Sequence, residues 1–163
     1  MTKQISLTQG QVAIVDDWWF DELNQYKWFA QWQPDTKSFR AVRSSSRLLG
    51  KRKFILMHVV IAGTPNRMVT DHINHNTLDN REINLRVCTC SQNLTNRGKQ
   101  ANNTSGYKGV FEDGKNWLAQ IRFNGKQYYL KTWPTKEQAA RAYDEAAKRL
   151  HGEFADLNFP QKK

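Results

Sequence analysis

The chain has 163 residues and carries 25 Lys and Arg against 15 Asp and Glu, a formal net charge of +10. This length allows one ordinary domain or two small ones, and the positive excess predicts a polyanionic partner, nucleic acid first of all. No apolar run approaches the roughly 20 residues of a membrane-spanning helix, and the amino terminus MTKQISLTQG is too polar for a signal peptide. We therefore expect a cytoplasmic protein that does not enter membranes.

Residues 1–50 predict a β-rich region with nearly balanced charge. Alternating apolar residues and turn residues predict strands at 5–7, 12–15, 28–32 and 39–43, with a short helix at 18–23 behind two aspartates. Four of the six tryptophans precede residue 33. We interpret them as the packing of a small domain that lacks the length for a larger core, and base stacking is the alternative.

Two features precede the most polar part of the chain. Residues 47–53 (RLLGKRK) are a basic turn, which is either a solvated hairpin tip or a phosphate clamp. The apolar run 54–62 predicts a buried strand or a short helix, ended by Gly63-Thr64-Pro65. His58 stands inside this run, so we expect a hydrogen-bonded core histidine rather than a ligand.

Residues 71–96 concentrate small polar side chains. They include Asp71, His72, His75, Asp79 and Glu82, together with six asparagines at positions 74, 76, 80, 84, 93 and 96. Each buried amide or carboxylate needs a polar partner, so the segment is either a solvated loop or a built site. An Asp-His pair suits metal-dependent hydrolysis, because a carboxylate holds a hard cation and an imidazole takes a proton near neutral pH.

The order of predicted elements would gather these residues. Residues 69–72 and 83–87 have the pattern of two hairpin strands with a polar loop between them. The T-x-x-Q form at residues 89–92 predicts a helix that starts near Cys90. Strand, loop, strand and helix would then bring the Asp71-His72 pair, Asn84 and Asn93 to one place.

The pattern D-H-I-N-x-N-x-x-D-N-R-x-x-N-L-R-x-x-T-x-x-x-N-x-x-N, which starts at Asp71, resembles the HNH endonuclease signature in its ββα-metal form. The likeness is to phage and intron-encoded HNH homing endonucleases that have Asn rather than His at the third position. The upstream text (LTQG, VDD, MH and IAGTP) resembles the leader of the same proteins, so the likeness covers roughly residues 1–100.

The resemblance implies a role for each matching residue. His72 would be the general base that takes a proton from the attacking water, and Asn84 would orient its imidazole through the side-chain amide. Asp71 and Asn93 would hold one divalent cation beside the scissile phosphate of double-stranded DNA. An Asn oxygen at the third position favours Mg²⁺ or Mn²⁺ over softer metals.

The implied protein is a metal-dependent, site-directed DNA endonuclease, encoded by a phage and active in a bacterial host. One active site per chain implies nicking, unless the protein dimerises. The alternative is a DNA-binding regulator with a non-catalytic HNH fold.

A zinc site is a second interpretation of the same segment. Its four ligands would be His72, His75, Cys88 and Cys90, although H-x-x-H and C-x-C are unusual spacings for zinc. Otherwise the two cysteines are reduced thiols.

The basic residues around the segment also have two interpretations. Arg81 and Arg86 bind either phosphates or the acidic residues of the loop. Residues 99–106 predict a linker, which, with Arg97 and Lys99, has the charge to follow a DNA groove.

The last part of the chain predicts a three-stranded antiparallel sheet and a helix. The strands are expected at 107–112, 116–123 and 126–133, the last two joined by Asn124-Gly125, the strongest short hairpin signal. A second capping box at 135–138 predicts a helix to about His151, with Gly152 as its stop. Its apolar face is expected to contain Ala139, Tyr143, Ala146 and Leu150, beside Ala140 and Ala147. Strand alternation leaves a polar, basic and aromatic sheet face with Gln120, Arg122, Gln127, Tyr129 and Lys131.

This segment resembles the Apetala/ethylene-response-factor DNA-binding domain over residues 106–160. The matching text is Y-K-G-V at 107–110, W-x-A-x-I-R at 117–122, A-A-x-A-Y-D at 139–144 and N-F-P at 158–160. In that family the exposed face of the sheet contacts a GC-rich site in the major groove. The matching positions here are Lys108, Gln120, Arg122, Gln127 and Tyr129. Phe111 and Asp113 stand where the plant proteins carry arginines, which implies a different target sequence.

We therefore predict an α+β protein in four parts. These are a β-rich region at 1–50, an HNH ββα-metal nuclease unit at 51–98, a linker at 99–106 and an Apetala-type DNA-binding domain at 107–160. We expect a monomer. The predicted DNA contacts are Lys108, Gln120, Arg122, Gln127, Tyr129, Lys131, Arg81, Arg86, Arg97 and Lys99.

Overall fold

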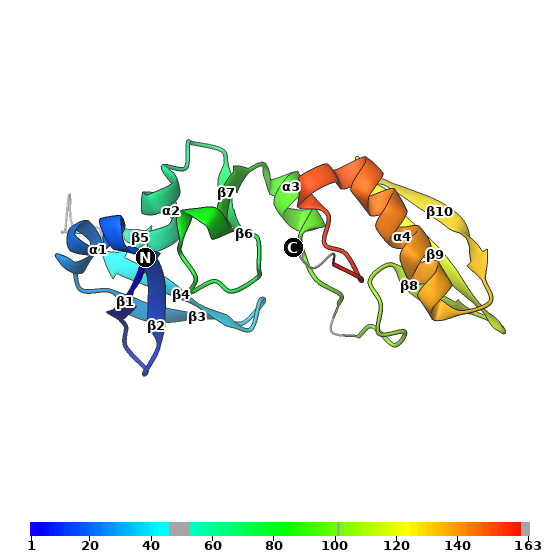
Figure 1. Cartoon of the computed structure of the whole chain (residues 1–163), viewed down its shortest axis with the longest axis horizontal. Helices are drawn as coiled ribbons and strands as arrows, with labels where there is room; N and C mark the ends of the chain where they lie inside the picture. The colour runs from blue at the N-terminus through cyan, green and yellow to red at the C-terminus, as the bar shows by residue number, and fades with distance from the viewer. Residues whose placement is uncertain (46–52, 101, 161–163) are drawn as a thin grey trace. The chain divides into compact units, whose positions relative to one another are not determined.

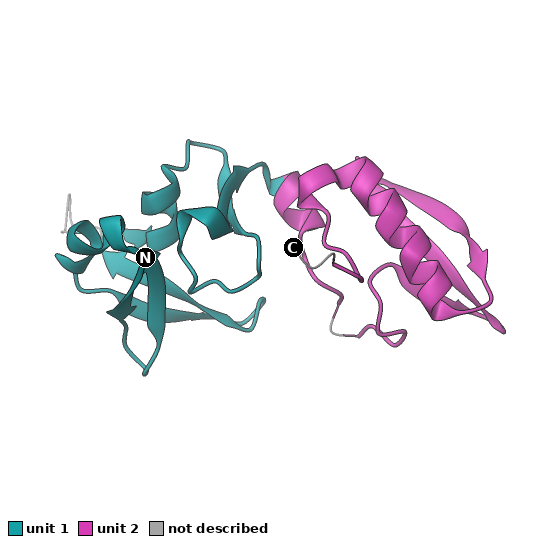
Figure 2. Ribbon diagram, viewed as in Figure 1, with its two compact units in different colours: residues 1–90 teal, residues 91–163 magenta. Residues whose placement is uncertain are grey.

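The computed structural model describes residues 1–45, 53–100 and 102–160. Apart from Lys53, the predicted basic turn at 47–53 lies outside the described residues. The chain divides into two compact units, Met1–Cys90 (unit 1) and Ser91–Lys163 (unit 2), which Figure 2 colours separately. Both units combine helices with antiparallel sheets, so the α+β prediction is confirmed at this level.

Unit 1 begins with two small antiparallel sheets (Figure 1). The first sheet pairs β1 (Thr2–Ser6) with β2 (Val12–Asp16), and α1 (Asp17–Asn24) follows. The second sheet has the order β3-β4-β5, formed by β3 (Phe29–Gln33), β4 (Ser38–Ser44) and β5 (Phe54–Leu56). The apolar run 54–62 forms both β5 and a short helix, α2 (Met57–Ala62), which ends at Gly63 in the left-handed conformation.

The core of unit 1 lies between these elements. Its buried members include Ile5, Val15, Leu23, Trp28, Met57 and Ile61. The indole of Trp28 donates a hydrogen bond to the carbonyl of Leu23 at 2.8 Å, so its polar atom is satisfied inside the core. The packing role predicted for the tryptophans is confirmed for Trp28. It is wrong for Trp18 and Trp32, which are 63% and 47% exposed.

A two-stranded hairpin completes unit 1. It pairs β6 (Val69–His72) with β7 (Leu85–Cys88), and a 3-10 turn, η1 (Glu82–Asn84), precedes β7. The second strand was expected from residue 83, but it starts at Leu85, because residues 82–84 form the turn η1, where Ile83 is 82% exposed. The predicted helix at Cys90 is confirmed as α3 (Cys90–Thr95), and all but its first residue belong to unit 2.

Unit 2 is built on a three-stranded sheet with one long helix on its face (Figure 1). The sheet order is β10-β9-β8, formed by β8 (Val110–Asp113), β9 (Asn116–Phe123) and β10 (Lys126–Trp133). Two of the three strands match their predicted bounds. β8 starts later than expected because Gly109 has a φ of +72°, which interrupts an extended strand.

The helix α4 (Lys136–His151) covers the sheet through small residues, and a 3-10 turn, η2 (Gly152–Phe154), follows it. The hydroxyl of Thr135 accepts a hydrogen bond from the backbone N–H of Gln138, as the capping box predicted. The buried face consists of Ala139, Ala140, Tyr143, Asp144, Ala146 and Ala147. The ring of Tyr143 covers Gly109 so closely that a Cβ there would lie 2.1 Å from it. In the described ranges, no helix combines the length and apolarity needed to span a membrane.

Candidate active site and nucleic-acid interface

The loop between β6 and β7 is fixed on two sides by other parts of unit 1. On one side, the N–H of Ile14 in β2 donates to the carbonyl of Leu78, and the N–H of Asn80 donates to the carbonyl of Ile14, both at 2.8 Å. On the other side, the hydroxyl of Thr77 donates to the carbonyl of Phe39 in β4 at 2.5 Å. The polar loop is therefore anchored to the rest of unit 1, although residues 73–76 are exposed to solvent.

The asparagines of the loop act mainly on its backbone. The side-chain oxygen of Asn74 accepts from the N–H of Asn76 at 2.9 Å, and that of Asn76 accepts from the N–H of Leu78 at 3.1 Å. The Asn74 amide also donates to the Asp79 carboxylate at 2.9 Å. Short side-chain to backbone bonds of this kind replace regular secondary structure, which explains the density of asparagine in the sequence.

Asn84 closes the loop at its base. Its side-chain oxygen accepts from the N–H of Asn74 at 2.9 Å, and its amide donates to the carbonyl of Asp79 at 2.7 Å. We expected this amide to orient the imidazole of His72. In the structure it acts on the loop backbone instead, and the described partner of the imidazole is a different asparagine.

That partner is Asn80, which is completely buried. Its side-chain oxygen lies 3.3 Å from Nε2 of His72, while its amide donates to the carbonyl of Leu78. Since the amide group has a carbonyl partner, the oxygen is the atom that faces the imidazole and accepts from Nε2–H. The proton on Nε2 leaves the lone pair of His72 on Nδ1.

His72 and His58 are neighbours in the interior of unit 1. Their ring centroids are 4.9 Å apart with an interplanar angle of 81°, and each residue is 7% exposed. Burial lowers the pKa of His72, against the opposing effects of Asn80 and Asp71, so the imidazole is neutral at neutral pH. Burial, helped by His72, lowers the pKa of His58 to about 3. His58 is thus the expected core histidine, but its Nδ1 has no hydrogen-bond partner in the part of the chain described.

Asp71 lies beside His72 at the end of β6 and faces Arg86 of β7 across the hairpin. Nε and one terminal nitrogen of Arg86 donate to the same Asp71 oxygen, at 2.9 and 2.7 Å. Arg81 likewise binds Asp79 with two nitrogens, at 2.7 and 2.6 Å, and its guanidinium lowers the pKa of that carboxyl. Of the two interpretations of these arginines, the structure shows ion pairs with acids of the site. Their phosphate contacts stay a prediction.

Asn93 lies on α3 in unit 2, so its approach to Asp71 stays a prediction. The donor set itself suits a hard cation, because a buried carboxylate and a side-chain amide both offer oxygen. Of the four proposed zinc ligands, Cys88 is buried, whereas Cys90 and His75 are exposed. Within the described residues, no three His, Cys, Asp or Glu side chains gather as a metal-binding group.

The outer face of the unit 2 sheet presents four of the ten predicted DNA contacts. Gln127 lies opposite Arg122, and Tyr129 lies opposite Gln120, in the pairing of β10 with β9. Arg122, Gln127 and Tyr129 are exposed, and Gln120 is partly exposed. The strand alternation therefore predicted this face correctly for four residues.

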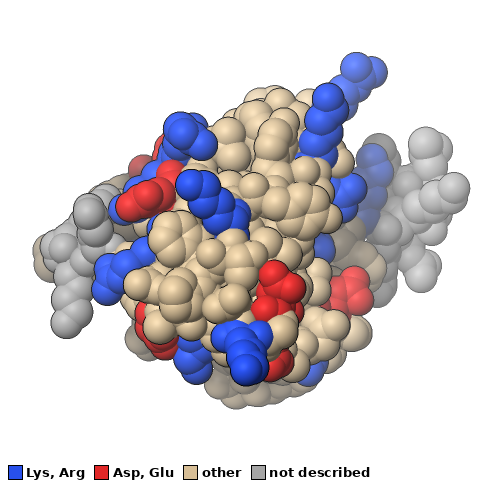
Figure 3. All heavy atoms as spheres, turned by 90° about the vertical axis from the view of Figure 1, so that its right-hand side faces the viewer, with Lys and Arg blue, Asp and Glu red and all other residues tan. Residues whose placement is uncertain are grey.

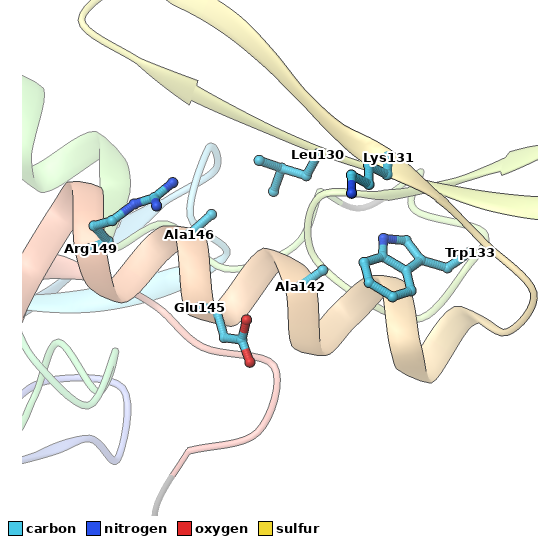
Figure 4. Close-up of a pocket in the computed structure, with 7 residues that line it drawn as sticks. All are labelled: Leu130, Lys131, Trp133, Ala142, Glu145, Ala146 and Arg149. Atoms are coloured by element: carbon cyan, nitrogen blue, oxygen red, sulfur yellow. The ribbon is translucent and has the colours of Figure 1, made fainter.

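Lys131 is a correction to that prediction. The register between β10 and β9 shifts between Tyr129 and Thr132, and Lys131 has a φ of +97°. Such a bulge turns the following side chains by one position. Lys131 consequently lines a groove between β10 and α4, together with Leu130, Trp133, Ala142, Glu145, Ala146 and Arg149 (Figure 4).

Lys108 is a second correction. Its ammonium donates to the carbonyl of Thr95 at 2.7 Å and lies 3.3 Å from the Asp156 carboxylate. Burial lowers the pKa of Lys108, and its side chain is 17% exposed. The ammonium therefore joins the start of unit 2 to its carboxy-terminal segment instead of facing DNA.

The remaining basic residues of unit 2 are dispersed. Arg97 and Lys99 are exposed, and Lys99 donates to the carbonyl of Gly106 at 3.1 Å. The face shown in Figure 3 has Lys and Arg side chains around a tan centre, with Asp and Glu at several places among them. The positive excess is thus spread over this face rather than gathered in one patch.

Sequence reasoning missed two residues of the site in unit 1. Asn80 was counted only as one of six asparagines, although the sequence Asp79-Asn80-Arg81 places it next to Asp79. Arg40 was assigned to a strand, but its charge lowers the pKa values of both His58 and His72. No local pattern indicated that β4 lies beside the loop.

Comparison with known proteins identifies both parts of the chain. The AP2 domain model matches residues 105–153. A protein of Acanthamoeba polyphaga mimivirus, named an uncharacterized HNH endonuclease, is 33% identical over 152 residues, which cover 92% of this chain and 76% of that protein. Dehydration-responsive element-binding protein 2A of Arabidopsis thaliana is 42% identical over 72 residues, which are 42% of this chain and 21% of the plant protein. A rice protein named for its AP2/ERF and B3 domains is 46% identical over 61 residues, 37% of this chain and 17% of its own length.

The plant relatives thus match one part of the chain, and the match spans about a fifth of their own length. The viral relative matches nearly the whole chain, including the loop and the hairpin of unit 1. The chain therefore belongs to the family of HNH endonucleases, and it carries an AP2-type domain at its carboxy-terminal end.

Proposed function

We propose that this chain is a DNA endonuclease that hydrolyses one phosphodiester bond per encounter. The observation that carries the proposal is His72, a neutral imidazole whose Nε2 is held by Asn80 and whose neighbour in sequence is a buried aspartate. With the proton on Nε2, the lone pair is on Nδ1, which would be the nitrogen that acts as the base.

Each residue of the site has a separate task in this proposal. His72 takes the proton of the attacking water, and Asn80 holds the imidazole in the tautomer that allows it. Asn84 holds both ends of the loop, so that Asn80 and His72 keep their positions. Preorganisation of this kind is needed because a displaced base loses much of its effect.

A divalent cation, Mg²⁺ or Mn²⁺, would be held by oxygens of Asp71 and Asn93. When bound, it would supply positive charge beside the scissile phosphate. Arg86 holds the Asp71 carboxylate in place by its two hydrogen bonds to one carboxylate oxygen.

The AP2-type unit would bind the duplex. The exposed face with Arg122, Gln127 and Tyr129 has the donors and the aromatic surface for the edges of bases in the major groove. With one site per chain, cleavage of one strand is the expected product. A homing role in a viral or phage-encoded element belongs to the same proposal.

The ion pair between Arg86 and Asp71 also favours a second candidate, a DNA-binding regulator with a non-catalytic HNH fold. In that case the positive charge of Arg86 would neutralise the Asp71 carboxylate in place of a cation. The two candidates make different predictions about cleavage, not about binding.

Nicking of supercoiled plasmid DNA separates them. The full chain is incubated with Mg²⁺ or with a chelator, and His72→Ala is compared with His75→Ala, which removes an exposed histidine three residues further on. The endonuclease proposal expects nicking with Mg²⁺ by the wild type and by His75→Ala only. Tight DNA binding without nicking by the wild type would favour the regulator.

A further inference from the structure

The outer face of the unit 2 sheet has an apolar part beside the polar part described above. Leu118 of β9 lies opposite Phe111 of β8 on one side and opposite Thr132 of β10 on the other. Directly opposed residues point to the same side of a sheet, so the three side chains lie side by side across it. We call Phe111, Leu118 and Thr132 the cross-strand row.

The cross-strand row belongs to the outer face of the sheet. Leu118 precedes Gln120 by two residues along β9, and side chains two residues apart in a strand share a face. Ala119, between them, is completely buried in the cluster beneath α4. Phe111 is 46% exposed, Thr132 is exposed, and Leu118 is partly buried. The row therefore continues the exposed face that the AP2-type unit would turn to DNA.

The cross-strand row offers a ligand mainly apolar surface. Phe111 and Leu118 carry no hydrogen-bonding group in their side chains. The hydroxyl of Thr132 donates to the Asp113 carboxylate at 3.1 Å, so its hydrogen is already bound within the sheet. The exposed carboxylate of Asp113, two residues from Phe111 on β8, adds a negative charge that repels a DNA phosphate at this end of the face. The row is thus unsuited to the DNA backbone.

One group in the major groove of DNA is apolar, the 5-methyl group of thymine. The other groups that base pairs present there are hydrogen-bond donors and acceptors, which gain nothing from a phenyl ring. A methyl group and an exposed phenyl ring that come into contact both lose contact with water, and this burial is favourable. Thymine is therefore the base that suits the row.

We propose that Phe111, supported by Leu118, is a specificity-determining residue that contacts the 5-methyl group of a thymine in the bound duplex. This inference rests on the DNA binding by the AP2-type unit in the proposed function, and it does not depend on cleavage. The polar end of the face, with Arg122 and Gln127, would bind donors and acceptors of neighbouring base pairs. The row would then select an A·T pair beside them, so the target is not a site of G·C pairs alone.

The test uses the full chain without a divalent metal, so that binding is measured without cleavage. Duplexes that the chain retains from a random pool are sequenced, and the selected site is synthesised again with deoxyuridine in place of each thymine in turn. Deoxyuridine pairs as thymine does and lacks only the methyl group. At one thymine, loss of the methyl group should weaken binding about fourfold, as expected for one buried apolar carbon.

Variants of the sheet assign this effect to a residue. Phe111→Ala should weaken binding to the thymine duplex and reduce the difference between thymine and deoxyuridine to less than about 1.5-fold, because both changes remove the same contact. Phe111→Leu keeps an apolar group and should keep most of the difference. Tyr128→Ala is the matched control, since Tyr128 is 43% exposed but lies opposite the buried Ile121, on the α4 side of the sheet. It should keep the full difference, and circular dichroism checks the fold of each variant.

Three results would overturn the inference. They are a selected site without thymine, binding with no sequence preference, and a difference between thymine and deoxyuridine that is absent or survives Phe111→Ala. A chain that binds no duplex would overturn the inference together with the DNA binding in the proposed function. A chain that shows the expected difference but does not nick DNA in Mg²⁺ would contradict only the proposed cleavage.

Discussion

The two units of this protein are stabilised in different ways. In unit 2, small alanines bring α4 against the sheet, and most of the buried side chains are apolar. In unit 1, an apolar core supports a second, polar interior in which Asp71, His72, Asp79, Asn80 and Asn84 are all buried.

The two units therefore differ in where their polar side chains lie. Buried polar groups need fixed partners, so the loop of unit 1 is held in one arrangement and presents a neutral imidazole at a defined angle. Unit 2 has fewer buried polar residues, of which Asn96, Ser105 and Asp144 are described. Its sheet carries other polar side chains, such as Arg122 and Gln127, on the exposed outer face. Under the proposed function, unit 1 would carry the reaction and unit 2 the DNA contact surface.

The apolar packing of unit 2 is most sensitive at Gly109. Gly109→Ala would place a Cβ 2.1 Å from the ring of Tyr143 and 2.7 Å from the carbonyl oxygen of Gln120, at a φ that disfavours a side chain. We expect a loss of about 4 kcal/mol in the unfolding free energy of unit 2, measured by urea denaturation. Gly114→Ala is the matched control, since its φ is +62° with no atom within 4 Å of the added Cβ, and should cost about 1 kcal/mol. Equal losses of unfolding free energy in the two variants would show that the close contact with Tyr143 does not add to the cost at Gly109.

The polar interior of unit 1 depends most on Asn84. Asn84→Ala would leave the N–H of Asn74 and the carbonyl of Asp79 without their partner, which should cost about 3 kcal/mol and abolish nicking. Asn76→Ala removes one exposed bond to the N–H of Leu78 and should cost less than about 1 kcal/mol. Urea denaturation and plasmid nicking measure both effects. An Asn84→Ala protein with wild-type stability and a wild-type nicking rate would contradict the proposal that Asn84 holds the loop for catalysis.

Acid should weaken unit 1 through His58. Its pKa is about 3 in the folded protein and near 6.5 in the unfolded chain, so the unfolded chain takes up a proton first as the pH falls. The contribution of neutral His58 to the unfolding free energy is complete above about pH 6.5 and is lost as the pH falls toward 3. It should decrease by about 2 kcal/mol between pH 7 and pH 5. Urea midpoints at several pH values measure this, and His58→Leu should remove most of the dependence. An unchanged dependence in His58→Leu would assign the acid sensitivity to other groups.

The outer face of unit 2 is expected to give the smallest effect. Arg122→Ala should reduce the preference for the target sequence by about 1–3 kcal/mol, toward the lower end because the side chain is exposed. Competition binding with target and unrelated duplexes measures the preference. Equal weakening on all sequences would mean that Arg122 contacts phosphate only.

Local patterns predicted most of unit 2. The Asn124-Gly125 turn and the Thr135 cap act within a few residues, so the bounds of β9, β10 and α4 followed from the sequence. The register shift that turns Lys131 toward α4 breaks the alternation without any local signal. Lys108 was misplaced because its partners Thr95 and Asp156 are distant in sequence.

For unit 1, the motif identified His72, Asp71 and Asn84, but not how they are held. The contacts of the loop with Ile14 of β2 and Phe39 of β4 join residues far apart in the chain. Such contacts depend on the tertiary fold, and no spacing rule indicates them. For this reason, Asn80 and Arg40 emerged only from the structure.

The most direct test of the account is the single-turnover nicking rate of His72→Ala at saturating DNA in Mg²⁺, with and without added imidazole. If His72 is the base, its loss should lower the rate at least about 100-fold with unchanged DNA affinity, and imidazole should restore part of the rate. A His72→Ala protein that nicks as fast as the wild type would contradict the account.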